Sequence, residues 1–92
     1  MRSLKIGRPG IWRLARRDCE LYSVQILSAG AFGAVRVLNG QDRVLFHQPS
    51  TFTGSFWLGA GAEGGLVVEL YSIDMAPNLT INWRVASRDI EA

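Results

Sequence analysis

The stretch "AVRVLNGQDRVLF", residues 34–46, carries the clearest structural signal of the chain. Apolar and polar residues alternate on both sides of Asn39-Gly40, a dipeptide that accepts the positive φ angles of a tight hairpin turn. We therefore predict a β-hairpin at this position. Its paired inward side chains are expected to be Val35, Val37, Val44 and Phe46.

Period-two alternation recurs along most of the chain, and helical periodicity is nearly absent. Turn signals separate the alternating runs at intervals of roughly eight to twelve residues, as in an all-β domain. We predict about eight short antiparallel strands in a single β-sandwich of the jelly-roll kind, with a small closed β-barrel as the alternative. The domain spans residues 1–92, with residues 1–10 as a basic N-terminal arm and residues 86–92 as a polar tail.

Alternation also assigns side chains to faces within the expected strands. One set on a common face is Tyr22, Val24 and Ile26, and a second is Phe52, Phe56 and Leu58. If Phe56 and Leu58 face the core, Trp57 between them faces outward. The outward positions of neighbouring strands then hold an apolar patch made of Trp57, Tyr71, Val67, Leu38 and Leu45.

This patch has three interpretations. Large exposed apolar patches mark protein interfaces, and aromatic residues are enriched in interface cores. A strand, a loop or the N-terminal arm of the same chain could cover Trp57 instead. As a third interpretation, Trp57 could stack on a sugar ring, as in carbohydrate-binding modules.

The composition favours association with other subunits. Apolar residues make up 48% of the chain and charged residues only 20%, although a domain of 92 residues has much surface to cover. No apolar run is long enough for a signal peptide or a membrane span, so we expect neither export nor membrane insertion. The single cysteine, Cys19, excludes an intrachain disulfide and a multi-cysteine zinc site.

The net charge of +2 conceals an uneven distribution. The first 17 residues hold six basic and no acidic side chains, whereas the remainder holds four basic and eight acidic ones. Such a basic end could dock onto an acidic partner, including another copy of the chain, or simply form a solvated edge that discourages aggregation. We do not expect nucleic acid as the partner. The predicted docking residues are Arg2, Lys5, Arg8, Arg13, Arg16 and Arg17.

Catalytic, metal and cofactor sites are not expected. The glycine-rich segment "GAGAEGG", residues 59–65, precedes a strand former and contains Glu63, so it lacks the helix and the charge of a phosphate-binding loop. We expect it to be a flexible hairpin connection between packed strands. Nothing in the spacing favours pairing His47 with Ser50 or Cys19 as a nucleophile. The eight acidic residues are scattered, and a calcium site at Asp18 and Glu20 would lack further ligands.

Two segments, "RVLNGQDRVLFHQPSTFTGSFWL" and "APNLTINWRV", give the chain a resemblance to small structural proteins of tailed-bacteriophage virions. The resemblance implies a symmetric oligomer, with a trimer among the symmetries considered. It also implies a location in the virion as a capsid cement, decoration or tail-accessory subunit. The partners it implies are further copies of the chain and a major capsid or tail protein. The alternative from the residues is a carbohydrate-binding β-sandwich module, and a small hydrolase is a formal third hypothesis.

Overall fold

The computed structural model describes residues 1–30, 32–49, 51–73 and 76–85, so the predicted polar tail at 86–92 lies outside the described residues. The described chain contains strands and connections but no helix, and therefore no helix that could cross a membrane. The strands are β1 (Arg2–Ile6), β2 (Gly10–Ala15), β3 (Cys19–Ser28), β4 (Gly33–Asn39), β5 (Val44–Pro49), β6 (Gly54–Ala62), β7 (Leu66–Ser72) and β8 (Asn78–Val85).

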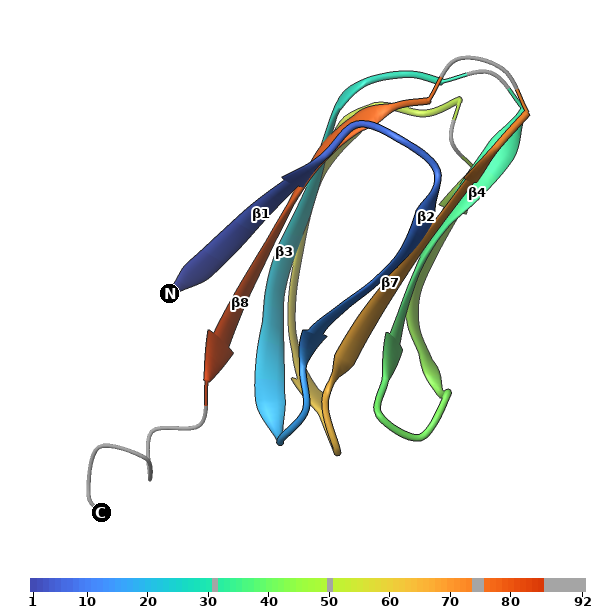
Figure 1. Cartoon of the computed structure of the whole chain (residues 1–92). Helices are drawn as coiled ribbons and strands as arrows, with labels where there is room; N and C mark the ends of the chain where they lie inside the picture. Colours follow the sequence, from blue (N-terminus) through green and yellow to red (C-terminus); the bar gives the residue numbers. More distant parts are fainter. Residues whose placement is uncertain (31, 50, 74–75, 86–92) are drawn as a thin grey trace.

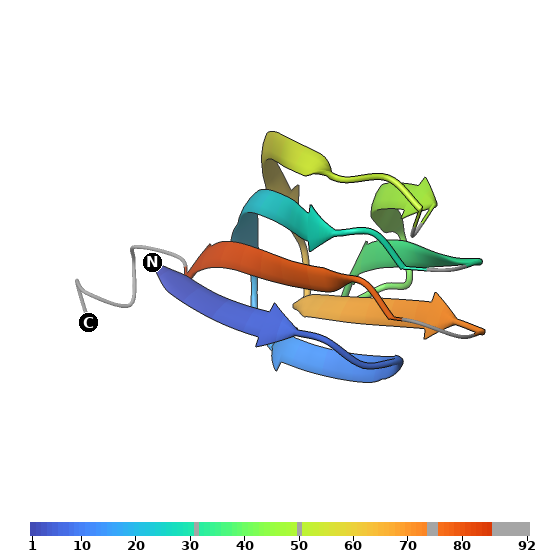
Figure 2. The ribbon, with the colours of Figure 1, turned by 90° about the horizontal axis from the view of Figure 1, so that it is seen from above.

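The strands form two antiparallel sheets, in the orders β1-β8-β3-β6 and β2-β7-β4-β5 (Figure 1). Figure 2 shows the sheets as two layers, with the edge strands β1 and β2 on one side and β6 and β5 on the other. The all-β prediction and the two-layered sandwich are confirmed. The closed barrel is wrong, because the eight strands divide between two separate sheets.

The predicted hairpin is the pair β4 and β5, and among the strands of the described residues it is the only pair of consecutive strands that are neighbours in a sheet. Its turn differs from the prediction, because the positive φ angle (64°) belongs to Asp42. Asn39 organises the turn instead, since its Oδ1 accepts hydrogen bonds from the backbone N–H of Gln41 (2.8 Å) and Arg43 (3.0 Å). Gly40 is required by crowding, because a Cβ there would lie 2.1 Å from the carbonyl oxygen of Gly64.

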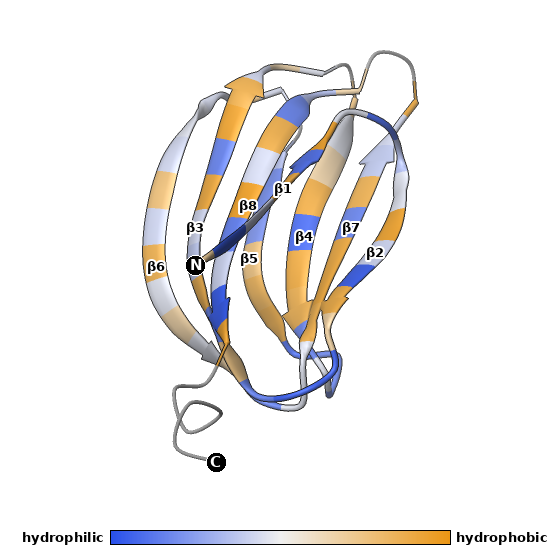
Figure 3. Ribbon diagram, turned by 60° about the vertical axis from the view of Figure 1, so that its left-hand side comes forward, coloured by the Kyte–Doolittle hydropathy of each residue, from blue (hydrophilic) through white to orange (hydrophobic). Residues whose placement is uncertain are grey.

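The core lies between the two sheets and is made of the inward side chains of both. In Figure 3, orange bands alternate with blue and pale ones along β3 and β8, as inward and outward side chains alternate. On the β5–β6 side, Phe46 and Phe56 close the sandwich with ring centroids 5.1 Å apart. The largest fully buried side chains are Leu21, Leu66, Leu79, Ile81, Val24, Val35, Val37 and Val68.

Register shifts overturn several of the predicted face assignments. In β3 the pairing shifts between Leu21 and Ser23, so Tyr22 turns away from the core that Val24 and Ile26 occupy. The second shift, opposite Val37 and Leu38, inserts Leu45 as an extra residue in β5. Bulges of this kind invert the alternation on one side of the inserted residue.

These shifts have consequences for individual side chains. Val44, predicted to be inward, is exposed, whereas Leu45, predicted to be outward, packs against the core. Phe56 is partly buried against the core as predicted. Leu58 is exposed, and Phe52 lies exposed ahead of β6, outside any strand.

The structure also corrects the predictions for two segments, the N-terminal arm and the glycine-rich connection. Residues 2–6 are not a separate arm, because β1 pairs with β8 throughout its length. The glycine-rich segment completes β6 and then joins it to β7, which lies in the other sheet. It therefore connects the two sheets and does not form a hairpin. At its turn, the N–H of Gly64 donates to Asp18 Oδ1 at 2.7 Å.

Candidate interaction surfaces

The outer side of the β2-β7-β4-β5 sheet carries a set of apolar side chains that we call the apolar face. Register places these side chains in adjacent rows across the four strands. Ile11 and Tyr71 are 72% and 62% exposed, and Val44 is 46% exposed. The members of the apolar face are Ile11, Ala34, Leu38, Val44, Val67 and Tyr71.

An ion pair occupies the middle of the apolar face. Arg36 on β4 lies directly opposite Glu69 on β7, and its guanidinium donates to Glu69 Oε1 through Nη2 (2.6 Å) and Nε (3.0 Å). These two strands are the central pair of the sheet, so the ion pair marks its midline. Both side chains remain partly exposed, at 43% and 32%. The apolar face therefore has one positive and one negative charge side by side at its centre. Arg13, which is paired with Val67 in the register, adds a further positive charge at its β2 edge.

The predicted patch of five residues does not form one surface. Tyr71, Val67 and Leu38 lie together on the apolar face, although neighbouring side chains bury Leu38 to 5% exposure. Leu45 packs against the core. Trp57 is 64% exposed as predicted, but it lies on β6 in the other sheet. The alternation rule located the outward positions, but it could not assign the strands to sheets.

Trp57 belongs to a surface of a different character, on the outer side of the β1-β8-β3-β6 sheet. Tyr22 packs edge-on against Trp57, with ring centroids 5.5 Å apart. A row of polar groups crosses the sheet beside this pair: Ser3 donates to Asn82 Oδ1 (2.9 Å), and Asn82 Nδ2 donates to Ser23 Oγ (2.9 Å). Trp57 continues the row, because it pairs with Ser23 in the register. Ser23 is completely buried, so Ser3, Asn82 and the two aromatic rings are the members of this set that solvent reaches.

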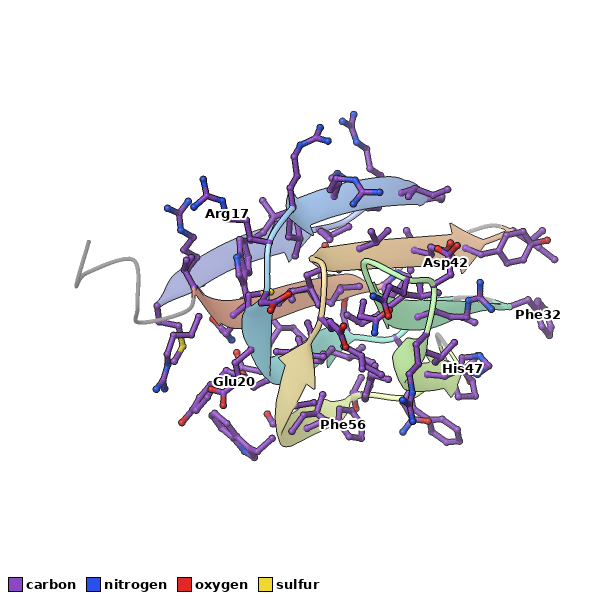
Figure 4. All side chains as sticks on the ribbon, turned by 90° about the horizontal axis from the view of Figure 1, so that it is seen from below. Arg17, Glu20, Phe32, Asp42, His47 and Phe56 are labelled. Carbon is purple, nitrogen blue, oxygen red and sulfur yellow. The ribbon has the colours of Figure 1, made fainter. Side chains whose placement is uncertain are left out.

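A cleft of about 460 Å³ opens between the two sheets at the ends of β2 and β8. Its apolar lining is Leu14, Ala15, Cys19, Trp83 and Val85, and its charged lining is Arg2, Arg13, Arg16, Arg17 and Asp18. In Figure 4, nitrogen-bearing side chains stand along β1 and β2, on the side where Arg17 is labelled. We call this site the basic cleft.

Two features of the basic cleft lack their usual partners. Among the described residues, the guanidinium groups of Arg2, Arg13 and Arg16 have no carboxylate within ion-pair distance. Trp83 is only 6% exposed, and its indole N–H is the buried side-chain donor without a hydrogen-bond partner in the described part of the chain. A buried donor left unpaired costs about 1–3 kcal/mol of stability.

Four of the six predicted docking residues meet at the basic cleft, namely Arg2, Arg13, Arg16 and Arg17. The other two lie elsewhere. Lys5 lines a second cleft, of about 390 Å³, with Leu27 and Asn78, and Arg8 lies in the connection between β1 and β2. The composition of the first 17 residues indicates that their basic side chains form a group. Which of these side chains line the cleft depends on the pairing of β1 with β8.

A further apolar region lies at the end of the sandwich where β3, β5 and β7 finish. Phe32 and Ile73 are 73% and 69% exposed there, and the N–H of Ile73 donates to the carbonyl of Phe32 at 3.0 Å. Phe32 lies at the far end of the molecule from Arg17 in Figure 4. Phe32 directly precedes β4 and Ile73 directly follows β7, the two central strands of the apolar face. Sequence reasoning missed them, because side chains in connections have no alternation to indicate their direction.

The groups considered for catalysis do not form a site within the described residues. The described chain contains no group of three or more His, Cys, Asp or Glu that could hold a metal ion. His47 is exposed on the edge strand β5, and Ser50 lies outside the described residues. Burial raises the pKa of the Cys19 thiol, and the neighbouring Asp18 carboxylate raises it further. This cysteine is therefore a poor nucleophile.

No protein-family model matches the chain, and no curated protein or solved structure matches it either. The surfaces of the chain that bear on its function are the apolar face, the polar surface beside Trp57 and the basic cleft.

Proposed function

We propose that this chain is a non-enzymatic assembly protein that pairs with a second copy of itself through the apolar face. The observation that carries the proposal is the Arg36–Glu69 ion pair on the midline of the β2-β7-β4-β5 sheet, framed by exposed apolar side chains. Interface cores combine apolar area with a few polar groups that need partners. A symmetric dimer requires a surface that is complementary to itself.

The apolar face meets that requirement for a two-fold axis that runs along the strands, between β7 and β4. Rotation about this axis lays each Arg36 over Glu69 of the second copy, so opposite charges meet across the interface. The same rotation lays the large Tyr71 over the small Ala34, and Val67 over Leu38. Sheets that pack face to face in this aligned way lie about 10 Å apart. On the two central strands, charge and side-chain size therefore both favour this pairing. On the edge strands the same rotation lays Ile11 over His47 and Arg13 over Val44.

The area of the sheet is small for a stable protein interface. Four strands about 4.8 Å apart, with about 3.3 Å per residue over seven-residue strands, give a face of roughly 440 Å². A stable interface usually buries about 800 Å² on each partner. The flat outline of the sheet is smaller than this, although the accessible surface of its side chains exceeds the outline. We therefore include Phe32 and Ile73, which extend the apolar face at the loop end, in the proposed interface.

We further propose that the protein is a virion component, a capsid cement, decoration or tail-accessory subunit located in the particle. The resemblance of the sequence to small virion proteins supports this role. The division of eight strands into two four-stranded sheets supports the jelly-roll form of the sandwich. Jelly rolls of this size occur in viral capsid proteins, which supports a role in the virion. In this role the basic cleft would face an acidic neighbouring subunit, such as a major capsid or tail protein.

The experiment is the oligomeric state by size-exclusion chromatography with multi-angle light scattering. We expect the mass of a dimer for the unmodified chain and of a monomer for Tyr71→Asp, which puts a charge into the apolar contact. Trp57→Asp is the matched control, because Trp57 is equally exposed but lies on the opposite sheet, and it should remain a dimer. A monomeric unmodified chain, or a dimer that Tyr71→Asp leaves intact, would contradict the proposal, and a trimer would contradict the two-fold arrangement.

A carbohydrate-binding module is the second candidate, and the polar surface beside Trp57 favours it. Ser3 and Asn82 present a hydroxyl and an amide group on the sheet that carries the exposed Trp57 indole, on which a sugar ring could stack, and the buried Ser23 holds the Asn82 amide in place. Glycan-array binding that is lost in Trp57→Ala and kept in Tyr71→Asp would favour this candidate. Absence of glycan binding by the unmodified chain would remove it.

A further inference from the structure

The basic cleft has the chemistry of a binding site for a particular kind of peptide. Its rim carries four guanidinium groups against a single carboxylate, Asp18, which already accepts a hydrogen bond from the backbone of Gly64. Three of the guanidinium groups, those of Arg2, Arg13 and Arg16, have no acidic partner among the described residues. Unneutralised positive charges held close together repel one another, and an anionic ligand would relieve that repulsion.

The lining of the cleft narrows the class of anion. Leu14, Ala15, Cys19 and Val85 are apolar, so they favour a ligand that places an apolar group between its negative charges. A nucleic acid strand has phosphates in close succession and binds best where its bases stack on aromatic rings. The exposed aromatic pair Tyr22 and Trp57 lies on the outer surface of a sheet and does not line the cleft, and Trp83, which does line it, is only 6% exposed. The lining therefore favours a peptide over a nucleic acid.

The cleft lies beside two edge strands whose free backbone groups can pair with the backbone of such a peptide. Arg2 belongs to β1 and Arg13 to β2, and these are the edge strands of the two sheets on the same side of the sandwich. Each edge strand has backbone N–H and C=O groups directed away from its only sheet neighbour, and an extended segment can pair with them. Trp83 also lines the cleft, and its buried indole N–H lacks an acceptor among the described residues.

We infer that the basic cleft binds an extended acidic segment of an assembly partner, in which an aliphatic side chain lies between carboxylates. The aliphatic side chain enters the cleft, the carboxylates pair with Arg2 and Arg16, and the segment runs along the edge of β1 or β2. The identity of the ligand as a partner's segment rests on the proposed assembly function. The affinity of the cleft for an acidic peptide can be measured on the isolated chain, whatever its oligomeric state.

The test uses the acetylated peptide Glu-Glu-Leu-Glu-Glu, titrated into the ¹⁵N-labelled chain and followed by NMR and by calorimetry. The indole N–H signal of Trp83 should move, and that of Trp57 should stay in place. The dissociation constant should rise at least about fivefold between about 50 and about 200 mM NaCl, because salt screens the carboxylate–guanidinium contacts. Replacing the leucine of the peptide by serine should weaken binding by about tenfold, since burial of the leucine is lost.

Two double variants with the same change in net charge locate the site. Arg2→Gln/Arg16→Gln should weaken binding by about tenfold, whereas Lys5→Gln/Arg8→Gln, outside the cleft, should change it by less than about twofold. Equal losses in both variants, an unmoved Trp83 signal, or no effect of the leucine would overturn the inference. Tighter binding of a thymidine hexanucleotide than of the peptide would also overturn the inference. Repeating the titration on Arg36→Glu separates failure of the cleft from failure of the proposed dimer.

Discussion

Reversing the charges of Arg36 and Glu69, at the centre of the apolar face, tests the two-fold arrangement. Arg36→Glu leaves two negative charges on the midline, and Glu69→Arg leaves two positive ones. In the two-fold arrangement each variant opposes its own copy with like charges, so each should be a monomer. A mixture of the two variants restores opposite charges across the axis and should form a heterodimer. The double exchange Arg36→Glu/Glu69→Arg should form a homodimer again.

The size of the effect follows from the exposure of the pair. In the single chain Arg36 and Glu69 are 43% and 32% exposed, so solvent screening limits their contribution to folding to at most about 1 kcal/mol. Covering the apolar face removes that solvent, and close charge pairs across protein interfaces couple by about 1.5 kcal/mol or more. Symmetry doubles the contact. A loss of about 3 kcal/mol corresponds to a dissociation constant roughly 150-fold higher.

Sedimentation velocity over a range of concentrations measures these dissociation constants, and circular dichroism checks that each variant remains folded. The Arg43→Glu and Asp42→Arg variants are matched controls, because both residues lie in the β4–β5 turn, away from the midline. They should leave the dimer unchanged. Folded single variants that dimerise as well as the unmodified chain, or a mixture that stays monomeric, would refute the two-fold arrangement.

Two further predictions concern stability and the thiol. Gly40→Ala should lower the free energy of unfolding in urea by about 1–3 kcal/mol, because its Cβ would meet the backbone of Gly64, whereas Gly61→Ala, whose Cβ would meet nothing within 4 Å, should change it by less than about 0.5 kcal/mol. Equal unfolding midpoints for the two variants would contradict the crowding at Gly40. The Cys19 thiol should ionise above its ordinary pKa of 9.0, so the stability it contributes is present below that pH and lost as the pH rises through the folded pKa. Absorbance at 240 nm follows the thiolate, Cys19→Ala should lack this alkaline loss, and ionisation at or below pH 9.0 in the native protein would contradict the prediction.

Much of the fold could be predicted from the sequence, because alternation and turn residues act locally. The strand content, the sandwich and the β4–β5 hairpin all follow from patterns within about ten residues. Bulges could not be predicted in this way, since the extra residue is defined only against a partner strand. Tyr22 and Leu45 were therefore assigned to the wrong faces. The turn also differed, because Asn39 acts through its side chain and Gly40 through contact with a glycine 24 positions away.

The candidate sites were less predictable than the fold. Outward apolar residues were recognised, but whether two of them share a sheet depends on strand order, which local patterns do not contain. Trp57 and Tyr71 consequently appeared to belong to one patch and lie on opposite sides of the sandwich. The basic residues of the first 17 positions were recognised as a group. The cleft that gathers four of them exists only because β1 and β2 enter different sheets.

The pairing of β1 with β8 also bears on how the chain is made. Arg2 is paired with Trp83 in the register of β1 and β8, so the first strand has no sheet neighbour until synthesis has passed about 80 further residues. At ribosomal rates of about 5–20 residues per second, β1 waits on the order of 4–16 s. Contacts between distant residues also slow folding itself, so we expect β4–β5 to form early and β1 to join last. Pulse-labelling hydrogen exchange during refolding should protect the Val37 amide before that of Leu4, and simultaneous protection would contradict this order.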